Sequence, residues 1–93
     1  MDKIEARAVL EEFLREFKTR SYLELQEFIS NPECLERVGP SGTVYQIEYE
    51  AVCDVEPGGD LRIIASIDDG GFLSALLPVS SSFIIAPQAK IGD

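Results

Sequence analysis

Apolar residues recur every three or four positions in the first third of the chain and every second position in much of the remainder. Over residues 2–18 they form one helical stripe opposite charged side chains, which predicts an amphipathic helix. Ser21 and Glu24 have the spacing of a capping box, so a second helix is expected over residues 22–29. Pro32 ends it, because proline disfavours the helical conformation of the preceding residue. The two helices could also form one bent helix.

The strongest strand signal covers residues 43–53, where apolar and polar side chains alternate. Residues 61–67 and 72–77 are expected to be further strands, and residues 83–85 form a last apolar stretch. Residues 33–38 fit either a helical turn or a short strand.

Helices followed by strands predict an α+β fold, with an N-terminal helix or helix pair packed on one face of an antiparallel β-meander of about four strands. A chain of 93 residues is expected to form one domain over residues 1–93. Residues 1–30 are its helical region, residues 33–87 form the antiparallel sheet, and residues 88–93 are expected to be a loose tail.

Asp69-Gly70 is the dipeptide preferred in two-residue type I′ turns, so the strands on either side of it are expected to pair with Ile67 opposite Phe72. In this register the sheet face turned away from the helices mixes aliphatic and charged residues, although a solvated face should be polar. Apolar patches on a monomer usually mark contact surfaces. Alternatively, residues 83–85 and the C-terminal segment cover this face, or strand coiling shrinks the patch. The predicted interaction surface consists of Val44, Glu48, Glu50, Arg62, Ile64, Leu73 and Leu77.

The chain carries 17 acidic and 8 basic residues, a formal net charge of -9. We therefore expect no binding to nucleic acid or to membranes, whereas a basic protein partner is favoured electrostatically. No apolar run is long enough to span a bilayer, and the N-terminal residues lack a signal-peptide pattern, which predicts a cytoplasmic protein. Cys34 and Cys53 are expected to be free thiols there, although the spacing leaves open whether they pair.

The absence of histidine removes serine–histidine catalysis and the common zinc sites. Glu48 and Glu50 lie on one strand face and could act as a carboxylate pair, but a solvated face explains them equally well. We expect no catalytic residue, no metal site and no cofactor. Acidic residues gather in the turns, where hard cations could bind, although ordinary turn chemistry also favours them. These residues are Asp54, Glu56, Asp60, Asp68 and Asp69.

Four segments together are similar to a family of short bacterial proteins that has no assigned activity. The segments are GPSGTVYQIE (39–48), PGGDLR (57–62), SIDDGG (66–71) and SFIIAP (82–87). The resemblance covers most of the chain from Ser21 onward, and departs from the family pattern after Pro87. It implies a stand-alone bacterial protein in which residues 33–38 form a hairpin with residues 43–53. It implies no activity, cofactor or catalytic residue.

These observations favour a non-enzymatic protein-interaction module that self-associates as a dimer through its sheet. The alternative is a small-molecule or lipid-binding module with a cavity between the helices and the sheet, lined by Phe13, Tyr45, Tyr49 and Phe72. A metal-assisted enzyme that uses the acidic turn residues is the third hypothesis.

Overall fold

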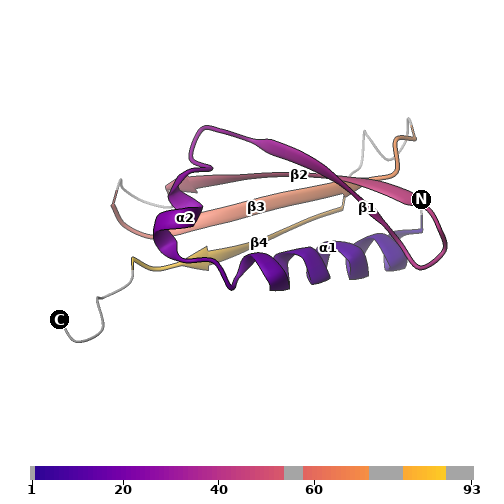
Figure 1. The fold of residues 1–93 in the computed structure, drawn as a ribbon, viewed down its shortest axis with the longest axis horizontal. Helices are drawn as coiled ribbons and strands as arrows, with labels where there is room; N and C mark the ends of the chain where they lie inside the picture. Colours follow the sequence, from indigo (N-terminus) through magenta and orange to yellow (C-terminus); the bar gives the residue numbers. More distant parts are fainter. Residues whose placement is uncertain (1, 54–57, 72–78, 88–93) are drawn as a thin grey trace.

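Two helices precede four antiparallel strands in the computed structural model, which describes residues 2–53, 58–71 and 79–87 (Figure 1). The described strands form one sheet of order β1-β2-β3-β4. The α+β prediction, with helices and a four-stranded meander, is therefore confirmed. The elements are α1 (Lys3–Phe17), α2 (Tyr22–Gln26), β1 (Glu33–Val38), β2 (Val44–Cys53), β3 (Leu61–Asp68) and β4 (Val79–Ile85).

Both helices begin within one residue of the predicted start. The carboxylate of Asp2 accepts hydrogen bonds from the backbone N–H groups of Ile4 and Glu5, each at 3.0 Å, and so caps α1. The predicted capping box of Ser21 and Glu24 starts α2. The apolar stripe of α1 is buried against the sheet through Ala6, Leu10, Phe13, Leu14 and Phe17.

Helix α2 ends at Gln26, three residues before the predicted end, because a tertiary contact competes with the helix. The Phe28 carbonyl accepts a hydrogen bond from the Ala51 N–H at 3.1 Å, and Ile29 forms a parallel bridge with Ala51. After Gln26 the backbone forms tighter i→i−3 hydrogen bonds. For example, the Ile29 N–H donates to the Gln26 carbonyl at 3.1 Å. The chain thereby enters the sheet next to β2.

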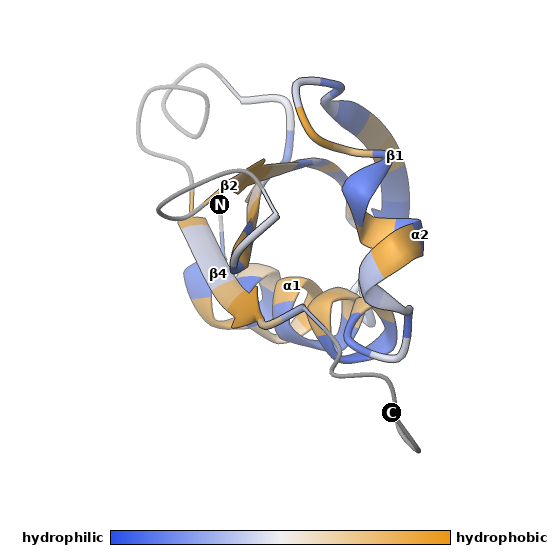
Figure 2. Ribbon diagram, turned by 90° about the vertical axis from the view of Figure 1, so that its left-hand side faces the viewer, coloured by the Kyte–Doolittle hydropathy of each residue, from blue (hydrophilic) through white to orange (hydrophobic). Residues whose placement is uncertain are grey.

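The core lies between α1 and the inner face of the sheet. Helix α1 contacts mainly β3 and β4, and the sheet curves around the helical layer with β4 on one side and β1 on the other (Figure 2). Every second residue of β2 and β3 therefore enters the core, as alternation predicts. The buried sheet residues are Tyr45, Ile47, Ala51, Leu61, Ile63, Ala65, Ile67 and Val79.

The predicted register after β3 is wrong. Ile67 pairs with Val79, not with Phe72, and β2 occupies the other edge of β3. After β3, the carboxylates of Asp68 and Asp69 accept hydrogen bonds from the N–H groups of Gly70 and Gly71 at 2.8 Å and 3.0 Å. The strand predicted over 72–77 lies outside the described residues, and the stretch 83–85 is the end of β4.

Candidate functional site

Five residues of the predicted interaction surface lie on the outer face of the sheet, turned away from the helices. Glu50 faces Ile64 across the β2–β3 pair, and Arg62 lies two residues from Ile64 on the same side of β3. Glu48 occupies the next outward position of β2. Val44 lies at the other end of β2, so the structure does not bring it next to Arg62.

The aliphatic residues of this outer face form two separate groups within the described part of the chain. Val38 pairs with Val44 at one end, and both are exposed. The remaining predicted surface residues, Leu73 and Leu77, lie outside the described residues. Polar side chains such as those of Glu48, Ser66 and Asp68 lie between the groups, and the second group consists of Val52, Ile64 and Ile84.

Strand β4 forms one end of the described sheet, and no residue of its sequence, VSSSFII, is charged. Proteins usually protect a sheet edge with charges, because the unpaired backbone groups of an edge strand can bind another strand. The opposite edge, β1, follows this rule with Glu33, Glu36 and Arg37. β4 is therefore the less protected edge.

Helix α1 packs beside β4 without fully covering its inner side chains. Phe83 and Ile85 point to the helical side but are only half-buried, and outward-facing Ile84 is 47% exposed. Lys18 places its Nζ atom 5.4 Å from the centre of the Phe83 ring. A strand added to this edge would bury further apolar surface of these residues.

A polar cluster of Glu5, Ser41 and Tyr45 ties the β1–β2 turn to the first turn of α1. The Tyr45 hydroxyl donates to Glu5 Oε1 at 2.6 Å, and the Ser41 hydroxyl donates to the same oxygen at 2.7 Å. The Ser41 N–H donates to Glu5 Oε2 at 2.8 Å. Gly39 lies so close that a Cβ atom there would be 2.9 Å from Tyr45 Cε2 and 3.0 Å from Glu5 Cδ, which explains the glycine.

The protonation of this cluster suits a structural role better than acid–base catalysis. Hydrogen bonds from Tyr45, and then from Ser41, lower the pKa of Glu5, so the carboxylate stays charged. The hydrogen bond to Glu5, and then burial, raises the pKa of Tyr45 to about 12. Neither group is poised to exchange a proton near neutral pH, where a general acid or base would act.

The Tyr45→Phe substitution should flatten the pH dependence of stability at both extremes. In the unmodified protein the lowered pKa of Glu5 contributes stability that is lost as the pH falls below 4.5. The raised pKa of Tyr45 contributes stability that is lost as the pH rises from 10.0 to about 12. Urea denaturation across the pH range measures both losses. In the control variant Tyr49→Phe, the loss of the free energy of unfolding at acidic pH should be unchanged. The account is contradicted if the free energy of unfolding of Tyr45→Phe varies with pH as in the unmodified protein, at both low and high pH.

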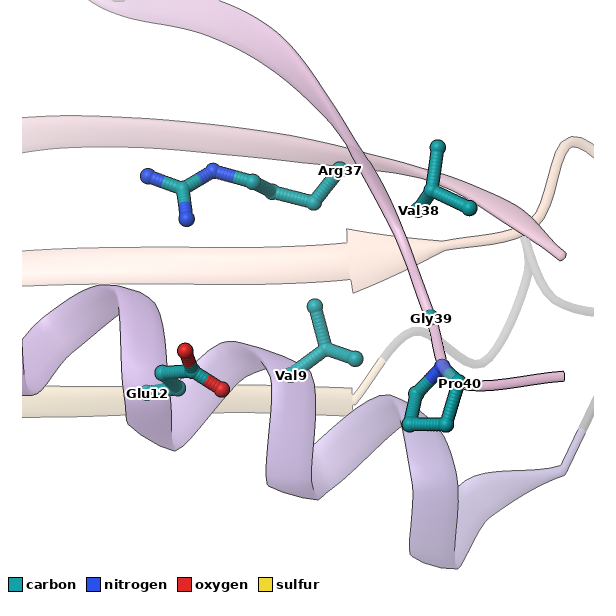
Figure 3. Close-up of a pocket in the computed structure, with 6 residues that line it drawn as sticks. All are labelled: Val9, Glu12, Arg37, Val38, Gly39 and Pro40. Carbon is teal, nitrogen blue, oxygen red and sulfur yellow. The ribbon is translucent and has the colours of Figure 1, made fainter. Parts of the chain in front are cut away.

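Beside the cluster, a surface hollow of about 280 Å³ lies between α1 and β1 (Figure 3). Arg37 on β1 forms a bidentate ion pair with Glu16 on α1, with N–O distances of 3.2 Å and 3.4 Å. Its guanidinium carbon also lies 5.7 Å from the centre of the Phe13 ring. These contacts fix the guanidinium at one end of the hollow, which is lined by Val9, Glu12, Arg37, Val38, Gly39 and Pro40.

A smaller hollow of about 90 Å³ shares Arg37 and is lined by three aromatic and three charged side chains together with Leu35. Phe13 and Tyr49, two of the residues predicted to line a ligand cavity, are in ring contact at 5.1 Å, and both line this small hollow. Tyr45 is instead 1% exposed within the core, and Phe72 lies outside the described residues. The structure therefore brings only part of the predicted cavity together.

The remaining candidates contribute little to a site. Among the residues that the structure describes, no group of three potential metal-ligating side chains is arranged to hold an ion, and Asp54 and Glu56 lie outside them. Cys34 is an exposed free thiol that points outward from β1, whereas the free thiol of Cys53 is half-buried. No described helix is long and apolar enough to cross a membrane.

Sequence reasoning missed Glu5 and Glu12, because it assigned helical charges to the solvated face. It missed Arg37 because residues 33–38 fitted either a helical turn or a strand. One signal was available for Arg37: it stands two residues from Leu35, so both point to the same side of β1, toward the helices. A charged residue at an inward position of a strand indicates a partner across the layer, here Glu16.

A scan against protein-family models and searches of curated proteins and of solved structures found no match. The resemblance to a family of short bacterial proteins therefore stays a prediction.

Proposed function

We propose that this protein is a non-enzymatic protein-interaction module that self-associates through the outer edge of β4, at the end of the described sheet. The observation that carries the proposal is an edge strand of seven residues, Val79–Ile85, without a single charge in a chain whose net charge is -9. Its half-buried apolar side chains gain burial when a second strand pairs with it. Arg62 and Ile64 of the predicted surface lie on the adjacent strand and would flank the junction.

Symmetry restricts how two β4 strands can pair. Directly opposed residues of an antiparallel pair point to the same face, so a twofold pair must contain a residue that faces its own copy. Only a register centred on Ser82 pairs all seven residues of β4. Ser81 then faces Phe83 of the second copy, and Val79 faces Ile85, which places small residues opposite large ones and joins apolar ends.

Electrostatics favours this edge over other contacts between two copies. Each copy carries a net charge of -9, so most surfaces repel each other at low salt. An uncharged strand allows close approach without bringing like charges into contact. The shared edge is short, so we expect a weak dimer that added salt strengthens by screening the remaining repulsion.

A Ser82→Cys variant should form a disulfide-linked dimer under mild oxidation, in a background where Cys34 and Cys53 are replaced by serine. Directly opposed residues of an antiparallel pair lie about 4.5–5.5 Å apart at Cα, within the range that a disulfide spans. Non-reducing gel electrophoresis and intact mass measure the yield.

The matched control is Ser80→Cys in the same background. In the proposed register Ser80 faces Ile84 of the second copy, so the two cysteines are too far apart to bridge. Efficient cross-linking of Ser82→Cys alone supports the proposal. Equal cross-linking of both variants, or of neither, overturns it.

A further inference from the structure

The hollow between α1 and β1 combines a charged end with an apolar end. Figure 3 shows the Arg37 guanidinium and the Glu12 carboxylate toward one end of it, on opposite walls. Val9 and Pro40 lie toward the other end, whereas the side chain of Val38 points away from α1. The walls come from different elements, since Val9 and Glu12 belong to α1 whereas Arg37 and Val38 belong to β1.

Both charged groups have binding capacity left. Arg37 uses its two terminal nitrogens for Glu16, and a guanidinium has five N–H donors, so further donors remain for a second anion. The side chain of Glu12 forms no ion pair or hydrogen bond with any other described residue. The hollow therefore offers a fixed donor group for an anion and an acceptor group for a cation.

We propose that this hollow binds a small zwitterion with a short aliphatic side chain, that is, a free aliphatic α-amino acid. Its carboxylate would bind the remaining Arg37 donors and its ammonium group would bind Glu12. The side chain would pack against Val9 and Pro40. The volume of about 280 Å³ lies just below the range of about 300–1,000 Å³ found for drug-sized ligands, so only a small ligand fits.

The charge pattern favours this ligand over simpler ones. A fatty acid would satisfy Arg37 and leave its carboxylate facing Glu12. An aliphatic amine would satisfy Glu12 and leave its ammonium group facing the guanidinium. Only a ligand that carries both charges on one head group matches both walls. The site lies between α1 and β1, so it does not depend on pairing at β4.

Titration with L-leucine, followed by the backbone amide shifts in ¹H–¹⁵N NMR spectra, tests this proposal. We expect saturable shifts confined to the lining residues, including Val9, Arg37, Val38 and Gly39. The matched probes are 4-methylpentanoate, which lacks the ammonium group, and 3-methylbutylamine, which lacks the carboxylate. Each should bind with an affinity at least about tenfold lower than that of leucine, since each lacks one charge-assisted contact.

The Glu12→Gln variant should weaken leucine binding by about tenfold, because the ammonium group loses its charged acceptor. Glu12 is exposed and the substitution keeps its size, so the fold should be unchanged. Glu36→Gln, on the outer side of β1, makes the same charge change and should leave binding unaltered. The proposal is overturned if no chemical shift changes at about 20 mM leucine, which is 20 times a dissociation constant of about 1 mM. Equal binding of all three probes also overturns it. Equal leucine affinity in Glu12→Gln also overturns it.

Discussion

The Ser82→Glu variant is expected to remain monomeric at concentrations at which the unmodified protein dimerises. In the proposed register each Ser82 faces its own copy, so the substitution places two carboxylates directly opposite each other at the centre of the junction. Within one copy, Arg62 already donates to the Ser82 hydroxyl at 3.4 Å, and it can pair with the new carboxylate. The fold should therefore tolerate the change, as circular dichroism would show.

Sedimentation equilibrium of Ser82→Glu beside Ser66→Glu separates the edge effect from a general charge effect. Ser66 lies on the same outer face, but on β3, which is paired on both sides. The Ser66→Glu variant adds the same charge without altering the outer edge of β4, so it should still dimerise. Loss of dimer in both variants, or in neither, argues against pairing through β4.

Replacing Leu10 by alanine should lower the free energy of unfolding by about 2–5 kcal/mol. Leu10 is 0% exposed and lies in the middle of the α1 stripe that covers the sheet. The truncation removes apolar surface from the core and leaves a cavity that the surrounding side chains fill only in part. Urea denaturation of the two proteins under the same conditions measures the difference.

The same leucine-to-alanine change at Leu23 provides the control. This side chain is 76% exposed on α2, so its loss should alter the free energy of unfolding by no more than about 0.5 kcal/mol. Similar losses at the two positions would mean that α1 does not anchor the fold as described.

The regular parts of this fold could be predicted because local chemistry and tertiary packing agree there. The α1 stripe, the Ser21–Glu24 capping box and the alternation of β2 each indicate the element that the structure contains. Predictions based on these patterns needed no knowledge of distant contacts.

The errors arose where a distant contact overrides a local signal. Asp69-Gly70 has the composition of a two-residue hairpin turn, yet β3 pairs with β4 so that Val79 lies opposite Ile67. Likewise, α2 stops early because Phe28 binds Ala51. The register of β4 and the end of α2 both depend on pairing with residues ten or more positions away, and a local sequence pattern carries no information about such partners.

In the candidate sites, too, some features follow from local patterns and others depend on distant contacts. The sequence directed attention to the outer face of the sheet, and the structure places Glu50, Arg62 and Ile64 close together there. It did not reveal the bond between Glu5 and Tyr45, because 40 residues separate them. Nor did it show that the uncharged strand Val79–Ile85 forms the end of the described sheet, since strand order is a property of the whole fold.

The molar mass of the unmodified protein in solution, measured by sedimentation equilibrium over a wide range of protein and salt concentrations, tests the central claim most directly. If two copies join through β4, the mass rises from 10.3 kDa toward twice that value as concentration increases, and the rise occurs at lower concentration when salt screens the charge of -9 on each copy. A mass that stays at 10.3 kDa under all these conditions would contradict the account.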